Sequence, residues 1–189
     1  WNKLRHFMFI KKEQRTFLEK KNMLVSRGKV HKTQPHRIKF MEQYYNHPMC
    51  NIGRVNTNEL SPLWKVPRLT IDQQLAYKFI LCLEGNDVAS NLKWVMSSES
   101  IAVMPKPKFE TWFMEGTLVA DVHYIKIKDD YSDLEQRLTY FIENQDKALQ
   151  IITNANTYVQ QFKDQKTEAL ISLLTLKKYF EKTDQSKLL

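Results

Sequence analysis

Apolar residues form short, uninterrupted runs in the middle of the chain. The densest run, 79–83, has the length of one buried strand, and turn-forming residues follow it at 84–87. A helical pattern over 88–96 comes next, and a second apolar run at 101–104 ends at a proline. Strand, turn, helix and strand in this order predict one unit of an α/β sheet, with 79–83 as a central strand.

The flanking segments continue this alternation of strands and helices. Apolar patterning predicts further strands at 23–30, 49–55 and 123–128, helices at 35–47, 71–76, 146–162 and 167–180, and a long loop at 56–69. Two capping boxes, Thr70 with Gln73 and Ser132 with Glu135, mark further helix starts. The order predicts a mostly parallel sheet that helices cover on both faces.

The net charge of the chain indicates an anionic partner but does not identify which kind. The chain has 189 residues, enough for one domain with a real core, and its 42% of hydrophobic residues is typical of a globular protein. Its net charge is +8, with the basic residues concentrated in 1–68 and an acidic stretch at 129–143. An excess of this size favours nucleic acid, an acidic membrane surface or a phosphorylated small molecule.

Cysteine use and the N-terminal segment indicate a cytoplasmic protein. Cys50 and Cys82 each lie within an apolar run, which predicts buried thiols in a reducing compartment. No run approaches the ~20 apolar residues of a membrane span. Residues 1–22 lack the pattern of a signal peptide and are basic and amphipathic. We interpret them as a linking helix packed on the domain; a helix lying on an acidic membrane is the alternative.

The carboxyl ends of the predicted strands are the first place to expect a ligand, because parallel sheets bind their ligands there. The segment from Glu84 to Lys93 contains a turn and a predicted helix start, whose unpaired N–H groups suit an anion. Arg27 and Gly28 end the strand at 23–30. An arginine there is well placed to grip phosphate with its planar fork, although a solvated surface arginine is the common alternative.

A metal site is not expected. His31 and His36 have no cysteine or carboxylate cluster near them in sequence. The acidic pair Asp129 and Asp130 comes just before a predicted helix, so we interpret it as charge that stabilises the helix N-terminus.

Taken as an ordered string, most of 23–162 resembles the conserved half of family-90 glycosyltransferases. The shared features include YKF, an acidic residue with glycine, a serine-containing helix start, WF, HY and DDYSDLE, preceded by SRG and then PHR. The family comprises bacterial lipopolysaccharide-core transferases and eukaryotic protein O-glucosyltransferases, and the bacterial branch is the more similar.

The resemblance implies a GT-B architecture, of which this chain would be mainly the Rossmann-like, three-layer α/β, C-terminal donor-binding half. It implies a nucleotide-sugar donor, often a UDP-sugar in this family, and a metal-independent, inverting transfer to a lipopolysaccharide or other glycan. No further cofactor is expected. The acidic catalytic base is expected in the N-terminal domain, and no residue of this sequence matches it. The implied setting is the bacterial cytoplasm, with the basic surface touching the inner membrane.

The resemblance also assigns residues to the donor. Arg27 matches the phosphate-binding arginine of the Arg-Gly motif, and Glu84 and Glu115 are candidates for bonding sugar or ribose hydroxyls; an exposed charge is the alternative for Glu115. The residues implied at the diphosphate are Arg27, Gly28, Gly85, Asn86, Asp87, Ser90, Asn91 and Lys93. Since a hydrogen bond to a charged group contributes about 1.5–3 kcal/mol, loss of Arg27 should weaken donor binding roughly tenfold to a hundredfold.

The expected division of the chain is a basic lead-in at 1–22, a nucleotide-sugar-binding domain at 23–162 and a C-terminal helix and tail at 163–189. Two other functions remain open on the sequence alone. A nucleic-acid-binding module is favoured by the charge, but it lacks a basic face interleaved with aromatic residues, so we expect no nucleic-acid partner. The other open function is a non-catalytic scaffold that contacts a membrane or a protein through its basic segment.

Overall fold

The computed structural model describes residues 7, 10 and 15–183, so the helix predicted within 1–22 lies mostly outside the described residues. The strands are β1 (Lys21–Gly28), β2 (Cys50–Arg54), β3 (Tyr77–Leu81), β4 (Ile101–Met104) and β5 (Ile125–Lys126). The helices are α1 (Pro35–Tyr44), α2 (Ile71–Gln74), α3 (Leu92–Val95), α4 (Leu134–Glu143), α5 (Gln145–Gln160) and α6 (Gln165–Lys182). Short 3-10 turns occur at η2 (Phe17–Glu19), η3 (Pro62–Trp64) and η4 (Glu115–Thr117).

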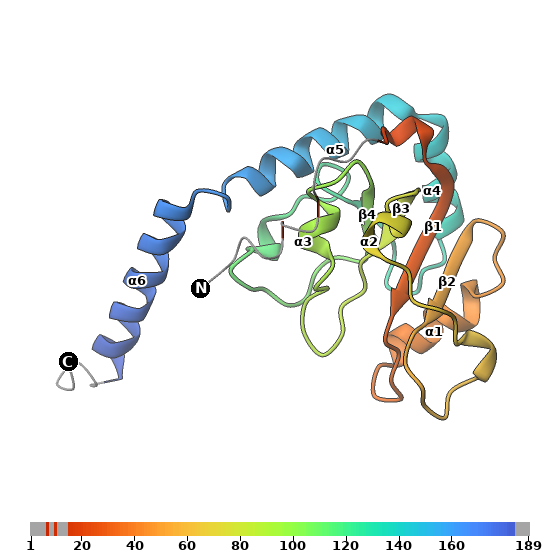
Figure 1. The fold of residues 1–189 in the computed structure, drawn as a ribbon, viewed down its shortest axis with the longest axis horizontal. Coiled ribbons are helices and arrows are strands. Elements are labelled where there is room, and N and C mark those ends of the chain that lie inside the picture. The colour runs from red at the N-terminus through yellow and green to blue at the C-terminus, as the bar shows by residue number, and fades with distance from the viewer. Residues whose placement is uncertain (1–6, 8–9, 11–14, 184–189) are drawn as a thin grey trace.

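The five strands form one parallel sheet in the order β2-β1-β3-β4-β5, with β3 in the middle (Figure 1). All five residues of β3 are buried, as expected of a strand covered on both faces. The predicted parallel sheet and the central position of this strand are therefore confirmed. Strand β3 ends at Leu81, but the N–H of Cys82 still donates to the carbonyl of Val103 at 2.9 Å, and the apolar run continues, still buried, to Leu83.

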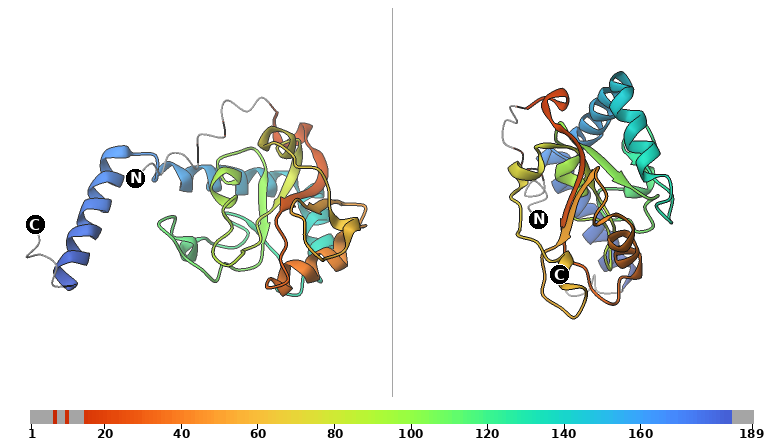
Figure 2. Two further views of the ribbon diagram at one scale, coloured as in Figure 1. Left: turned by 60° about the horizontal axis from the view of Figure 1, so that its bottom comes forward. Right: turned by 90° about the vertical axis from the view of Figure 1, so that its right-hand side faces the viewer.

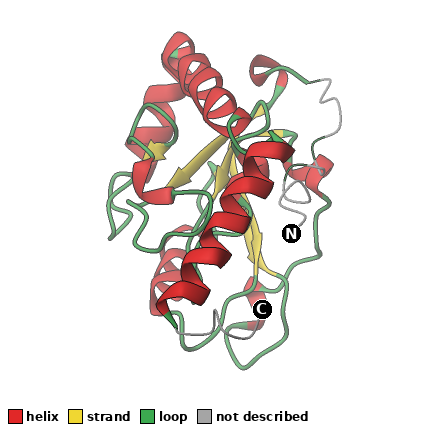
Figure 3. Ribbon diagram, turned by 90° about the vertical axis from the view of Figure 1, so that its left-hand side faces the viewer, coloured by secondary structure: helices red, strands yellow, loops and turns green. Residues whose placement is uncertain are grey.

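Successive side chains of the strands point alternately into two separate apolar layers, one on each face of the sheet. Leu24 and Phe79 face a layer that includes residues of α1 and α4. Val25 and Ile80 face the opposite layer, which includes α3. The long helix α5 supplies both layers in turn, first through Ala148, Ile151 and Ile152 and then through Ala155 and Val159. Seen from the end that carries α6, the strands run between helices, in a three-layer, Rossmann-like arrangement (Figure 3).

The helix predicted over 88–96 is wrong in extent, since α3 has only four residues. Local hydrogen bonds hold the preceding turn in another shape: the Asp87 carboxylate accepts from the N–H of Val88, and the Asp87 carbonyl accepts from the N–H of Gly85. Asn91 donates its side-chain amide to the carbonyl of Leu81 instead of capping the helix. Side chains that bond to nearby backbone compete with helix in this way.

Two other predicted features also differ. The strand expected over 123–128 contributes only two residues to the ladder, because the N–H of His123 turns back to the carbonyl of Val119. The capping box of Ser132 with Glu135 does not form: Ser132 bonds to the Asp130 carboxylate and α4 begins after Asp133. The other box, Thr70 with Gln73, forms as predicted.

Both cysteines are buried free thiols, as predicted. Burial raises the pKa of Cys50 to about 12 and that of Cys82 further, so neither thiol is ionised near neutral pH. Within the part of the chain that the structure describes, no helix is both long enough and apolar enough to cross a membrane.

The last helix, α6, extends away from the sheet (Figures 1 and 2). None of its residues is buried, although it carries many large apolar side chains. The exposed ones are Leu170, Ile171, Leu173, Leu174, Leu176 and Tyr179. They point in all directions around the helix axis, so this helix adds nothing to the two apolar layers.

Ending the chain at Asp164 should therefore leave the stability of the remaining domain almost unchanged. No side chain of α6 is buried, so its loss opens no cavity and we expect Tm to change by less than about 2 °C. Calorimetric melting of the full and shortened chains measures this. A fall of Tm well beyond that range would mean that α6 supports the domain.

Candidate functional site

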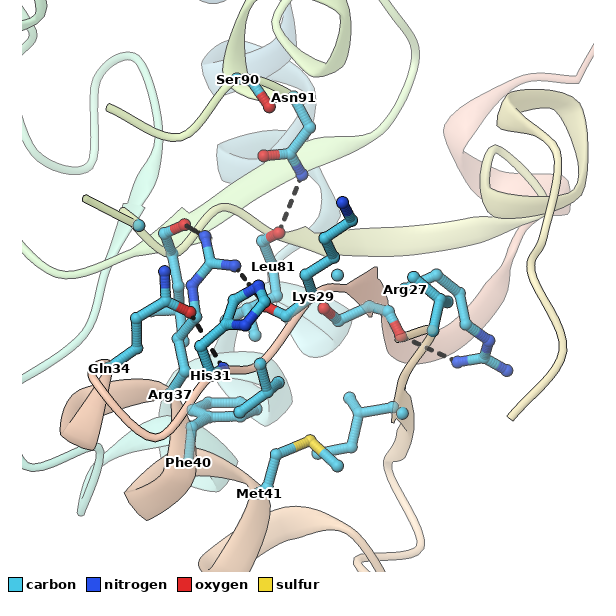
Figure 4. Close-up of a pocket in the computed structure, with 18 of the residues that line it drawn as sticks. Arg27, Lys29, His31, Gln34, Arg37, Phe40, Met41, Leu81, Ser90 and Asn91 are labelled. Carbon is cyan, nitrogen blue, oxygen red and sulfur yellow. Dashed lines mark hydrogen bonds between the residues drawn. The ribbon is translucent and has the colours of Figure 1, made fainter. Parts of the chain in front are cut away.

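A crevice opens where the chain reverses its course across the sheet. From β1 it continues through α1 to β2 at one edge, and it then returns to β3 on the other side of β1. The connections that follow β1 and β3 therefore leave in opposite directions, which makes the gap between their carboxyl ends a topological switch point. A cavity of about 610 Å³ lies there. The strand ends, the β1–α1 loop, α1 and the turn 85–91 line it (Figure 4).

The walls of the cavity are strongly cationic. Among its described lining residues, Asp87 is the one carboxylate, against four full positive charges and one histidine. The cationic side chains are Arg27, Lys29, Arg37 and Arg68, with His31 beside them. Apolar residues form part of the lining, among them Phe40, Met41, Leu81 and Trp94. A polar, positively charged hollow with apolar patches suits a ligand that joins an anionic group to a ring.

Arg27 lies in the wall of this cavity, but its guanidinium group is engaged within the chain. Nη1 donates to the carbonyls of Ser26 and Asn51 at 2.9 and 2.8 Å, and Nη2 donates to the side-chain oxygen of Asn51 at 2.6 Å. Nε donates to the carbonyl of Pro67 at 3.2 Å. Partial burial lowers the pKa of Arg27, and it remains a cation. Figure 4 shows it on the far side of the cavity from Gln34 and Arg37.

Arg37, in the first turn of α1, spans the crevice itself. Its Nη1 donates to the carbonyl of Lys29 after β1 at 2.6 Å, while Nη2 and Nε donate to the carbonyls of Leu83 and Glu84 after β3 at 2.7 and 2.8 Å. Burial lowers its pKa, and its charge has no carboxylate partner among the described residues. This residue therefore joins the two strand ends and adds an unneutralised charge between them.

A second bridge crosses the crevice beside it. The side chain of Gln34 donates to the side-chain oxygen of Asn86 at 3.1 Å and accepts from the N–H of His31 at 3.3 Å. A Cβ on Gly85 would lie 3.3 Å from Nη2 of Arg37, which is tighter than an ordinary contact. The absence of a side chain at Gly85 therefore lets this turn approach the guanidinium.

The turn before α3 contributes side chains to the cavity, and the short helix after it adds only a small dipole. Ser90 and Asn91 line the cavity, and Asn91 is held by its bond to Leu81 at 2.9 Å. The expected anion site at a helix start loses most of its physical basis, because a helix of four residues sums few peptide dipoles.

Lys93 and Glu115 are not brought to the cavity. They form a buried ion pair with 2.5 Å between Lys93 Nζ and Glu115 Oε1, and the two side chains are 3% and 1% exposed. Glu115 also accepts from the N–H and hydroxyl of Thr111. Burial by itself would raise the pKa of Glu115, but these hydrogen bonds together hold it below its ordinary value. This placement does not agree with the expected phosphate role of Lys93. It agrees neither with the expected bond from Glu115 to sugar or ribose hydroxyls nor with the alternative of an exposed charge.

Glu84 faces another part of the sheet edge. Its carboxylate accepts from the N–H groups of Lys108 and Phe109 at 2.9 and 3.1 Å, which fixes the loop after β4. It lines a smaller cavity of about 170 Å³ that shares Leu83 and Gly85 with the large one. The two hollows are thus neighbours along the carboxyl ends of the strands.

Within the described residues, no group of three or more His, Cys, Asp and Glu side chains is arranged to hold a metal ion. Asp130 accepts from the N–H and the hydroxyl of Ser132, and these bonds lower its pKa. Asp129 pairs with Lys108 at 3.4 Å on the surface.

The large cavity brings together most of the residues predicted at the diphosphate. Those present are Arg27, Gly28, Gly85, Asn86, Asp87, Ser90 and Asn91. Sequence reasoning did not assign Lys29, His31, Gln34, Arg37 and Arg68 to the site. Two signals for Arg37 were available: the PHR motif in the family resemblance, and its place in a proline-started helix after a strand end.

Comparisons with known proteins give one family match and two relatives. A model of glycosyl transferase family 90 matches residues 1–177. The O-glucosyltransferase LpsA of Dichelobacter nodosus is 42% identical over 177 residues, which cover 94% of this chain and 55% of that protein. The uncharacterized protein 179R of Invertebrate iridescent virus 6 is 28% identical over 115 residues, 57% of this chain and 9% of that protein. The chain thus spans about half the length of LpsA.

Proposed function

The chain belongs to glycosyl transferase family 90, and on that premise we propose that its large cavity binds the nucleotide-sugar donor of a glycosyl transfer reaction. The observation that carries the proposal is the surplus of positive charge at the switch point of a parallel sheet, with Asp87 as the one carboxylate in the described lining. The proposed donor is a UDP-sugar, and the proposed acceptor is a lipopolysaccharide or another glycan. LpsA, named as an O-glucosyltransferase, supports the reaction class.

The cavity suits the departure of a diphosphate. As the bond between the sugar and the diphosphate breaks, negative charge grows on the leaving phosphate, and cations already in place stabilise that charge. Lys29, Arg37 and Arg68 are such cations. We propose an inverting transfer that needs no metal, in which a carboxylate outside this cavity takes the proton of the acceptor hydroxyl. With this division of roles, we propose that the chain is the donor-binding half of a GT-B enzyme.

The net charge of +8 favours a second candidate, an anionic membrane surface or nucleic acid as the partner. For a transferase that acts on lipid-linked glycans, the two ideas are compatible, because an acidic membrane would bring the basic surface close to its acceptor. We propose such a peripheral contact on the cytoplasmic side. Cosedimentation with anionic vesicles at low salt tests it, and a chain that ignores such vesicles contradicts it.

Calorimetric titration tests the main proposal. UDP and UDP-sugars should bind, and uridine should bind at least about tenfold more weakly, because it lacks the groups that form charged hydrogen bonds of about 1.5–3 kcal/mol each. A chelator should leave the affinity for UDP unchanged. Duplex DNA serves as the comparison ligand: tighter binding to DNA than to any nucleotide-sugar, with a steep dependence on salt, would replace this proposal with the nucleic-acid one.

A further inference from the structure

Arg27 and Arg37, two of the three arginines that line the cavity, differ in how many N–H donors they have left. A guanidinium group carries five N–H donors. Arg27 uses four of them: one on Nε, both on Nη1 and one on Nη2. Arg37 uses three, one on each nitrogen, so one N–H on Nη1 and one on Nη2 have no acceptor among the described residues. Arg37 alone of the two retains a pair of donors on separate nitrogens, which a two-toothed contact with phosphate requires.

The space around these two nitrogens is kept free by glycines. A Cβ on Gly28 would lie 3.6 Å from Nη1 of Arg37, and a Cβ on Gly85 would lie 3.3 Å from Nη2. Each end of the fork thus faces a residue that has no side chain to cover it. Both glycines line the same cavity as Arg37, so a phosphate group entering there meets no intervening side chain from either of them.

The charge of Arg37 is also in an unfavourable place when no anion occupies the cavity. It lies in the first turn of the ten-residue helix α1, and this first turn contains no acidic residue. A cation there opposes the positive end of the helix dipole. The three carbonyl bonds hold the guanidinium without neutralising it. An anion bound between the strand ends would remove this repulsion, which an ordinary structural role for Arg37 would leave uncompensated.

We infer that Arg37 is the residue that recognises the donor's diphosphate with a two-toothed contact, and that Arg27 is a positioning residue. In this assignment, which rests on the proposed function, Arg27 fixes Asn51 and the backbone at Pro67 around the cavity. The ligand chemistry is that of a nucleoside diphosphate, in which two adjacent phosphates offer oxygens to the fork. The charge of Arg27 still adds to the field of the cavity.

The test compares variants by how strongly they distinguish UDP from uridine. Arg37→Gln should weaken the binding of UDP and pyrophosphate roughly tenfold to a hundredfold and leave that of uridine unchanged, so the ratio of the two affinities collapses. Arg37→Lys should recover part of the loss, because an ammonium keeps the charge without the fork. In the matched control Arg27→Gln, a loosened cavity should weaken the binding of both UDP and uridine, so the ratio of the two affinities should change far less than in Arg37→Gln.

A second variant that keeps the guanidinium group tests the inference even if Arg37→Gln does not fold. Gly85→Ala puts a methyl group 3.3 Å from Nη2, so it should weaken UDP binding while Tm stays within about 2 °C of the wild type. Unchanged UDP affinity in both Arg37→Gln and Gly85→Ala would overturn the inference, as would a collapse of the ratio in Arg27→Gln instead. A wild-type chain that binds no nucleotide at all would overturn the proposed function itself.

Discussion

Replacing Lys93 with methionine is expected to lower Tm by about 6–20 °C. The substitution leaves Glu115, 1% exposed, as a buried carboxylate without its cation. Breaking a buried ion pair by removing one partner costs about 3–5 kcal/mol, and each kcal/mol corresponds to about 2–4 °C in a chain of this size. The ammonium also lies 5.3 Å from the centre of the Phe113 ring, a contact that methionine replaces only in part. Thermal melting of both chains measures the effect.

Two further variants separate the charge from the packing. The double variant Lys93→Met with Glu115→Leu removes both charges, so it should be clearly more stable than Lys93→Met alone. Lys108→Ala breaks the exposed pair with Asp129, where we expect a change below about 1 kcal/mol. A Lys93→Met chain that melts like the wild type would show that this pair does not support the fold.

The same pair predicts a dependence on pH. The pKa of Glu115 is lower in the folded chain than its ordinary value of 4.5. The stability that it contributes is therefore fully present above about pH 4.5 and is lost as the pH falls through the folded pKa. Glu115→Gln cannot ionise, so its stability should change less than that of the wild type between neutral pH and the acid limit.

The strands could be predicted because their signal is local. An uninterrupted apolar run bounded by turn residues, as at 79–83 and 101–104, has few alternatives to a strand buried on both faces. The length of α3 could not be predicted in the same way. Its end is decided by hydroxyl bonds from Ser97 and Ser98 to helix carbonyls, and its start by the bond of Asn91 to Leu81. These contacts depend on where the turn lies against the sheet.

The candidate site was predictable as a region and not as a set of contacts. Parallel strands must end at one edge, so placing Arg27 and the turn at 85–91 together required only the strand order. Which way each side chain points is decided by packing. Arg27 lies two residues after Val25 in β1, so both side chains point to the same face of the sheet. Helix α1 packs on the opposite face, so Arg27 faces away from Arg37. Lys93 finds its partner 22 residues away, which no spacing reveals.

The second large effect is expected from Gly53→Ala, which should cost about 1–3 kcal/mol and lower Tm by about 2–12 °C. Residues 55–69 form a strap along the outer strand, and the N–H of Val66 donates to the carbonyl of Arg54 at 3.0 Å. A Cβ on Gly53 would lie 2.8 Å from Cγ1 and 3.0 Å from Cβ of Val66, and it would overlap Cγ2. Valine is short and stiff, so the strap itself has to move.

Movement of the strap should also reach the donor cavity, because Pro67 holds Nε of Arg27 at 3.2 Å and Arg68 lines the wall. We expect UDP to bind on the order of threefold to tenfold more weakly, less than on loss of a contacting arginine. Val66→Ala in the same chain removes both clashing methyl groups and should restore most of the stability and affinity. Gly116→Ala is the matched control, since its Cβ meets only the flexible end of Glu110 at 3.1 Å. A Gly53→Ala chain that melts and binds UDP like the wild type would show that the strap adjusts freely and does not set the position of Arg27.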